Sequence, residues 1–183
     1  MAETIEELDL SGNVSKSELI HVLKKEASRI HMYDLMRTSA HLHEEGMYMQ
    51  ADYRKNFINI FIKEFINRFK EVNEDKKEHN GYIEGKTLQK FLKTIKMERK
   101  IQKKDLKINS GKYFLKFAKM AEIIAVYTTF ILESPVHPVG TLFPGKLTLK
   151  SENNEYLCPV KEKNLNNPYA LCRFCVSKQL KDI

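Results

Sequence analysis

The amino-acid sequence predicts a mainly α-helical protein in which a four-helix bundle-like core is followed by a C-terminal β-hairpin and a cysteine knuckle. Two observations predict the helices: apolar residues recur at spacings of three and four before residue 133, and Pro135 and Pro138 then end this pattern. A third predicts the knuckle, because all three cysteines lie beyond those prolines. We therefore expect a loosely ordered acidic N-terminus at residues 1–14, a helical domain at 15–134, and a hairpin with a Cys/His knuckle at 135–183, appended to the same domain.

Four helices are expected in order along the first part of the chain. Ser15 opens the capping-box pattern S-x-x-E, so the first helix is expected from there to about residue 43. The second is expected at about 51–72, where five apolar residues alternate spacings of four and three. Thr87 is expected to cap the third helix. The fourth is expected at about 112–132, and its second half is apolar nearly all round, which predicts a central place in the bundle.

The segment after the prolines alternates instead of repeating at helical spacing. In "KLTLKSENNEYLC", Leu147 and Leu149 alternate with polar residues up to an Asn-Asn pair, and the chain returns through Tyr156. This pattern predicts a short β-hairpin. The final stretch, "CVSKQLKDI", is expected to form a short helix.

Signals for export and for a membrane span are absent from the sequence. The N-terminal "MAETIEELDL" is acidic and lacks the basic and apolar regions of a secretory signal. The most apolar run, at residues 121–132, is shorter than the roughly 20 residues that a spanning helix needs. We therefore expect a cytoplasmic protein with no membrane partner, in which thiols stay reduced and a disulfide is the weaker interpretation of the cysteines.

Motifs of the common catalytic centres are also missing. The sequence has no glycine-rich phosphate loop, no G-x-S-x-G and no H-E-x-x-H. With only seven glycines, a nucleotide-cradling loop is disfavoured. The missing motifs favour a binding or scaffold protein over an enzyme. They leave open the catalytic residues, the macromolecular partner and the oligomeric state.

Positive charge is concentrated in one segment of this basic protein. The net charge is +7, and residues 86–119 carry twelve basic residues against two acidic ones. Such a run can form a helical ridge that neutralises the phosphates of nucleic acid, or it can be an ordinary solvated helix face. Lysines without interleaved arginines or aromatic residues do not favour readout of bases. The candidate nucleic-acid-binding residues are Lys86, Lys90, Lys93, Lys100, Lys104 and Lys107.

The cysteines have the spacing of a metal site. Cys172 and Cys175 form a C-x-x-C pair, whose two thiolates can grip one ion from a single turn, and Cys158 lies 14 positions before the pair. Tetrahedral zinc needs a fourth ligand. A zinc ribbon would place a cysteine three residues after Cys158, but Lys161 stands there. The best remaining candidate is His137, which lies between two prolines, and a structural Cys3His zinc site is the leading interpretation.

Three other interpretations remain open for the same cysteines. They could hold an iron–sulfur cluster or an open metal, which would make the chain an enzyme or an electron carrier. The C-x-x-C pair could be redox-active, although the βαβ context of thioredoxin-like proteins is missing. The cysteines could also be small buried apolar residues.

Three C-terminal motifs resemble those of a known family. "HPVGTLFPG", "YLCPVK" and "LCRFC", in that order, resemble an uncharacterised family of small proteins from methanogenic archaea. The resemblance implies a cytoplasmic archaeal protein and an anaerobic setting, in which an iron–sulfur cluster gains some weight as an alternative to zinc. It implies no catalytic residue.

Overall fold

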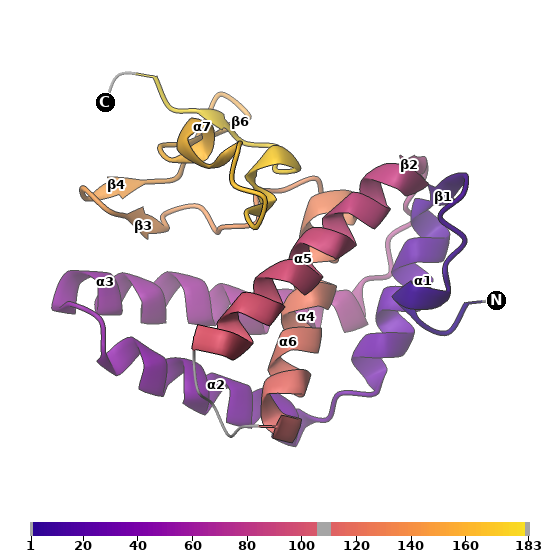
Figure 1. Cartoon of the computed structure of the whole chain (residues 1–183), viewed down its shortest axis with the longest axis horizontal. Helices are drawn as coiled ribbons and strands as arrows, with labels where there is room; N and C mark the ends of the chain where they lie inside the picture. Colours follow the sequence, from indigo (N-terminus) through magenta and orange to yellow (C-terminus); the bar gives the residue numbers. More distant parts are fainter. Residues whose placement is uncertain (1, 106–110, 182–183) are drawn as a thin grey trace.

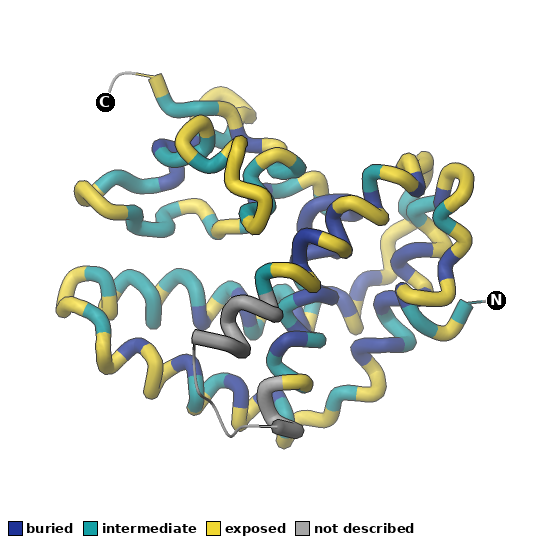
Figure 2. Tube along the Cα trace, viewed as in Figure 1, coloured by how far each residue is buried: buried dark blue, intermediate teal, exposed yellow. Residues whose placement is uncertain are grey.

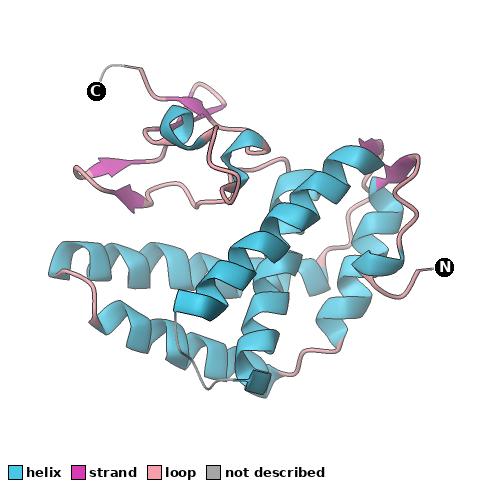
Figure 3. Cartoon of the chain, in the orientation of Figure 1, coloured by secondary structure: helices cyan, strands magenta, loops and turns pink. Residues whose placement is uncertain are grey.

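The computed structural model describes residues 2–105 and 111–181, and it is mainly helical, which confirms the predicted class (Figure 3). The helices and helical turns are η1 (Ile5–Glu7), α1 (Lys16–Ser28), α2 (Met32–Met47), α3 (Ala51–Asn56), the π-helical η2 (Phe57–Ile62), α4 (Lys63–Glu74), α5 (Gly85–Asp105), α6 (Gly111–Val126), the π-helical η3 (Tyr127–Ile131), α7 (Lys161–Asn164) and η4 (Leu171–Arg173). The strands are β1 (Asn13–Ser15), β2 (Tyr82–Glu84), β3 (Leu142–Phe143), β4 (Leu147–Thr148), β5 (Lys150–Glu152), β6 (Glu155–Cys158) and β7 (Lys178–Gln179).

The first predicted helix is two helices. Its start is confirmed, because the Glu18 backbone N–H donates to Ser15 Oγ at 3.1 Å. The single run to residue 43 is wrong, since α1 ends at Ser28 and α2 begins at Met32. His31 has extended backbone dihedrals, and its N–H donates to the Asp34 carboxylate at 3.2 Å, so a new helix starts there. The division changes the direction of the chain (Figure 1), and the arrangement does not confirm a four-helix bundle.

The second predicted helix is confirmed as one uninterrupted run of α3, η2 and α4. The structure adds the π-helical turn η2 in its middle, which the apolar spacing did not predict. A π turn inserts one extra residue into the helical repeat and is common at functional sites. Here η2 carries Phe61 to the wall of the cavity described below.

The third helix begins earlier than predicted, at Gly85 instead of Thr87. The Gly85 N–H donates to the Gly12 carbonyl at 2.9 Å. A Cβ at Gly85 would lie 2.3 Å from the Gly12 carbonyl oxygen and 2.4 Å from that of Leu10. Glycine is therefore required where the antiparallel β1–β2 ribbon meets the start of α5.

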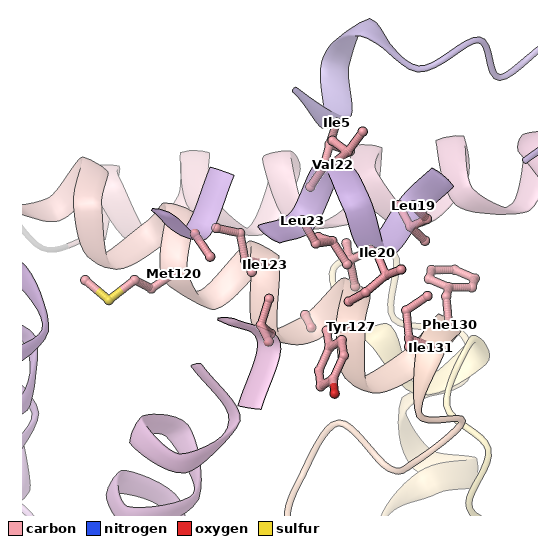
Figure 4. Close-up of a cluster of buried hydrophobic side chains, with 14 of the residues drawn as sticks. Ile5, Leu19, Ile20, Val22, Leu23, Met120, Ile123, Tyr127, Phe130 and Ile131 are labelled. Atoms are coloured by element: carbon pink, nitrogen blue, oxygen red, sulfur yellow. The ribbon is translucent and has the colours of Figure 1, made fainter. Parts of the chain in front are cut away.

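The acidic N-terminal segment, expected to be loosely ordered, is packed against the helices from η1 onward. Ile5 is 1% exposed and Leu8 is 6% exposed. These residues lie three apart, so a single 3-10 turn places both on one face. Figure 4 shows Ile5 beside Val22 of α1. The apolar pair buries its surface against α1, while the acidic residues between them remain outside.

The core lies where α6 and η3 pack between the other helices, which confirms the central place predicted for the fourth helix. Met120, Ile123, Val126 and Tyr127 are 0% exposed. Figure 4 shows Met120, Ile123 and Tyr127 along this helical run, and the dark blue stretches of Figure 2 gather where the helices meet. The predicted end at about residue 132 is also confirmed, since η3 ends at Ile131. No helix in residues 2–105 or 111–181 combines the length and the apolar character needed to cross a bilayer.

The predicted hairpin is confirmed in the C-terminal segment. Antiparallel β5 and β6 are joined by Asn153 and Asn154, which have φ values of 50° and 60°. Asparagine adopts this left-handed conformation more readily than most residues, and two in succession form the tight turn that suits the twist of a hairpin. The short β3 and β4 form a second antiparallel pair just before it.

The expected C-terminal helix is wrong. Residues Lys178–Gln179 form β7, which lies parallel to β6. The Leu180 N–H donates to the Cys158 carbonyl at 3.0 Å, and the Gln179 side chain donates to the Pro159 carbonyl at 3.2 Å. The first of these hydrogen bonds uses a backbone N–H that a local helix would have paired internally. The chain after Cys175 therefore runs beside Cys158.

Candidate functional site

A cavity of about 550 Å³ lies between the helices and the C-terminal segment, which sits over α3 and α4 in Figure 1. One wall is apolar and comes from η2, α4 and α6. The other wall comes from residues 136–177 and carries the cysteines. The apolar wall includes Phe61, Phe65, Phe117, Ala121 and Ile124, and the second wall includes His137, Phe143, Cys158, Lys161, Cys172 and Cys175.

All three cysteines line this cavity, although they come from two separate segments. Cys158 ends β6 and is buried, whereas Cys172 lies in η4 and Cys175 follows it, both half-buried. The parallel pairing of β7 with β6 returns the second segment to the first. In the described ranges, no three histidine, cysteine, aspartate or glutamate side chains are grouped so that they could hold a metal ion.

The surroundings of Cys158 and Cys172 favour the neutral form of these two thiols. Burial raises the pKa of Cys158, and hydrogen bonds from the Val160 and Lys161 backbone N–H groups offset part of this rise. Burial also raises the pKa of Cys172, and negative charge on Cys158 and Cys175 would raise it further. The pKa of Cys158 and that of Cys172 therefore both respond to charge on the other cysteine segment or on a neighbouring cysteine.

Lys161 holds the two cysteine segments together. Its ammonium Nζ donates to the Cys175 carbonyl at 2.7 Å. The same positive charge lowers the pKa of Cys158 and of Cys172, against the larger effect of burial. The sequence identified Lys161 only as a missing zinc ligand. In the structure it is a cation at the sulfur end of the cavity.

His137 lies on the wall of the same cavity. Its ring meets the Phe143 ring edge-on, with centroids 5.3 Å apart. His137 is an exposed residue, but the protein atoms around its ring displace enough water to lower the pKa of the imidazole. His137 also borders a second cavity of about 400 Å³, on the side of Arg68 and Tyr156. A neutral imidazole at neutral pH is the form that can bind a metal.

The two residues between the cysteines of the C-x-x-C pair fasten it to α5. Arg173 donates to Thr94 Oγ1 at 2.6 Å, and Thr94 is 1% exposed. The Phe174 ring meets Phe91 edge-on, with centroids 5.2 Å apart. This anchor was not predicted from the sequence. The only signal for it there is that one basic and one aromatic residue stand between the two cysteines.

Asn56 connects the other end of the C-terminal segment to α3. Its side-chain Nδ2 donates to the Gly140 carbonyl at 2.8 Å, and its Oδ1 accepts from the Leu142 N–H at 2.9 Å. One amide thus satisfies a backbone acceptor and a backbone donor on the loop that follows His137. This pairing fixes the position of that loop over the helices.

We expect Asn56→Ala to lower the free energy of unfolding by about 2 kcal/mol, because two half-buried backbone groups lose their partner. Urea denaturation measures the loss, and limited proteolysis should cut residues 135–160 faster. Asn59→Ala is the matched control, since Asn59 is exposed on the neighbouring turn η2. Equal stability of the two variants would contradict a role for Asn56 in holding the loop.

The candidate nucleic-acid ridge can be examined over part of its length. Lys86, Lys90 and Lys93 are exposed on α5, as predicted. The side chains of Lys100 and Lys104, and Lys107 entirely, lie outside the described residues. Nucleic-acid binding by this ridge stays a prediction.

Residues 15–180 match the model of a protein family described as "Uncharacterized protein conserved in archaea (DUF2115)". The chain belongs to this family. The DUF2115 match includes the helices, His137 and all three cysteines, and it confirms the resemblance drawn from the C-terminal motifs. No solved structure matches the chain.

Several methanogen proteins named UPF0305 are similar to this DUF2115 chain over nearly its whole length. One from Methanothermobacter thermautotrophicus is 39% identical over 93% of this chain and 99% of its own. UPF0305 protein MJ0646 from Methanocaldococcus jannaschii is 29% identical over 91% of this chain and 97% of its own. UPF0305 protein MmarC5_0909 from Methanococcus maripaludis is 27% identical over 88% of this chain and 94% of its own.

Proposed function

We propose that the chain is a binding protein whose C-terminal segment forms a cysteine knuckle around one zinc ion held by Cys158, Cys172 and Cys175. The observation that carries the proposal is that thiols from two segments line one cavity. Thiolate is the protein ligand that zinc favours, and a site rich in thiolates is usually structural. The ion would clip β6 to the turn η4.

Two local features support a site of this kind. Backbone N–H groups of Val160 and Lys161 donate to the Cys158 sulfur, and such hydrogen bonds stabilise a thiolate bound to metal. The Lys161 ammonium offsets part of the negative charge that three thiolates would bring. A movement that brings the ligand side chains together would be needed, because among the described residues they are not grouped for metal binding as they stand.

His137 is our proposed fourth ligand. It lines the same cavity, and the low pKa of its ring keeps the imidazole neutral at neutral pH. Because zinc must displace protons from thiols whose pKa is raised, zinc affinity should increase from pH 6 to pH 8.

Elemental analysis of protein purified without added metal tests the proposal. We expect about one zinc per chain, and none in Cys172→Ser, because that variant loses one of the three thiolates, the ligands that zinc favours in such a site. Competition with a chromogenic chelator should show about tenfold or greater weakening in His137→Ala. His43→Ala is the matched control, since His43 is exposed on α2, away from the cysteine cavity.

Two results would contradict the proposal. The first is protein that contains no zinc and fails to bind it when titrated under reducing conditions. The second is brown protein absorbing near 400 nm after anaerobic purification, which would instead favour an iron–sulfur cluster on the same cysteines.

A further inference from the structure

We propose that the cavity between the helices and the C-terminal segment binds a small organic molecule with an apolar aromatic body and an anionic head group, the head lying beside Lys161. This inference goes beyond the proposed zinc site, which concerns the three cysteines and His137 and assigns no ligand to the rest of the cavity.

The size and walls of the cavity suit the body of such a ligand. Its volume of about 550 Å³ falls within the range of about 300–1,000 Å³ that is usual for pockets that hold small molecules. The rings of Phe61, Phe65 and Phe117 form a continuous aromatic row, with neighbouring ring centroids 6.2 Å and 5.7 Å apart. Ile124 and Ala121 of α6 extend this wall. An aromatic body would gain apolar contact without leaving a buried polar group unpaired.

The positive charge of Lys161 indicates that the head group of the ligand is anionic. Its ammonium can donate three hydrogen bonds, and the one assigned to it goes to the Cys175 carbonyl. In the described ranges, no carboxylate forms an ion pair with it. Glu98, which also lines the cavity, is already engaged in an interaction of its own. A half-buried ammonium with spare donors at the end of an apolar cavity favours a carboxylate, sulfonate or phosphate.

Two fluorescent probes distinguish the contribution of the aromatic body to binding from that of the anionic head group. 1-Anilinonaphthalene-8-sulfonate carries the anionic group, whereas N-phenyl-1-naphthylamine has the same aromatic body without it. We expect one site per chain for each probe and tighter binding of the sulfonate. Lys161→Met should weaken sulfonate binding by about tenfold or more and leave the neutral probe within about twofold, because only the charge-assisted contact is lost.

Matched variants make the result specific. Lys163→Met removes an exposed lysine from the same short helix α7 and should change neither probe, while Lys161→Arg should keep the preference for the sulfonate. Ala121→Phe places a bulky ring within the cavity and should abolish binding of both probes. Cooperative thermal unfolding confirms that each variant is folded, and zinc content measured on the same samples distinguishes loss of metal from loss of the ligand site.

Two outcomes would overturn the inference. If Lys161→Met weakens both probes equally, or weakens neither, Lys161 does not receive the head group. If Ala121→Phe is folded and still binds both probes at full affinity, the probes bind elsewhere on the molecule.

Discussion

Replacing Lys119 with methionine should lower the free energy of unfolding by about 3–5 kcal/mol at neutral pH, because it removes the cation between two buried carboxylates. Lys119 Nζ lies 2.6 Å from Glu26 Oε1 of α1 and 2.9 Å from Glu122 Oε1 of α6. The two glutamate side chains are only 2% and 1% exposed. Methionine keeps the length and apolar character of the lysine stem, so the variant tests the charge.

The loss should depend on pH in a definite direction. Burial raises the pKa of Glu26 above its ordinary value, even though the contact with Lys119 lowers it. Ionisation of this carboxyl therefore opposes folding, and the stability it contributes is lost as pH rises through its folded pKa. Without Lys119, the ionised Glu26 carboxylate destabilises the folded state more. The Lys119→Met variant should therefore lose more stability at pH 8 than at pH 5.

Urea denaturation at the two pH values measures this difference. Lys96→Met is the matched control: Lys96 pairs with Glu6, both side chains are 51% exposed, and little change is expected. Glu26→Gln should restore part of the stability when added to Lys119→Met, because it removes one of the buried charges. A loss of equal size at both pH values would show that packing, and not charge, explains the effect.

Asp75→Asn should cost about 2–3 kcal/mol at pH 7, since hydrogen bonds to a buried charge are stronger than those to a neutral amide. Asp75 Oδ2 accepts from the Tyr127 hydroxyl at 2.7 Å and lies 2.8 Å from His79 Nε2. Its Oδ1 accepts from the Lys77 N–H at 2.8 Å. One carboxylate thus ties the loop after α4 to the buried turn η3. The carboxylate side chain is 2% exposed.

This stabilisation should disappear in acid. Burial alone would raise the pKa of Asp75, but hydrogen bonds from Tyr127, from the Lys77 N–H and from His79 outweigh it and leave the pKa lowered. The contribution is complete above the pKa of unfolded aspartate and is lost as pH falls through the folded pKa. The unmodified chain and Asp75→Asn should therefore converge in stability below that range.

Denaturant titrations at pH 7 and in acid check the prediction. Asp52→Asn is a control, because the ion pair between Asp52 Oδ2 and Lys146 Nζ, 3.5 Å apart, lies on the surface with side chains 71% and 78% exposed. Its effect on stability should be small at both pH values. If the stability gap of Asp75→Asn persisted unchanged in acid, the charge of Asp75 would not be the source of the stabilisation.

Part of the proposed functional site could be predicted from the sequence, and part depends on the tertiary structure. Spacing selected the three cysteines, the need for a fourth ligand and the flanking prolines selected His137, and all four residues line one cavity. The sequence did not predict the aromatic wall opposite them, because Phe61 and Phe65 lie on a different predicted helix from Phe117 and no local pattern relates the two helices. Nor did it assign a role to Lys161, whose contact with the second cysteine segment depends on where that segment returns.

The sequence by itself determined the features that depend on neighbours along the chain. Apolar spacing located most helices, Ser15 marked the start of α1, and the Asn-Asn pair marked the hairpin turn. These signals act within one or two turns of backbone, so local chemistry is sufficient to specify them.

The tertiary structure decided the features that depend on distant partners. β7 exists because its backbone pairs with β6, although its sequence suits a helix. Ile5 and Leu8 are ordered because α1 offers an apolar surface, and Glu26 is tolerated in the core because Lys119 arrives from α6. In each case the free energy comes from a contact between segments far apart in sequence, and no local pattern encodes that contact.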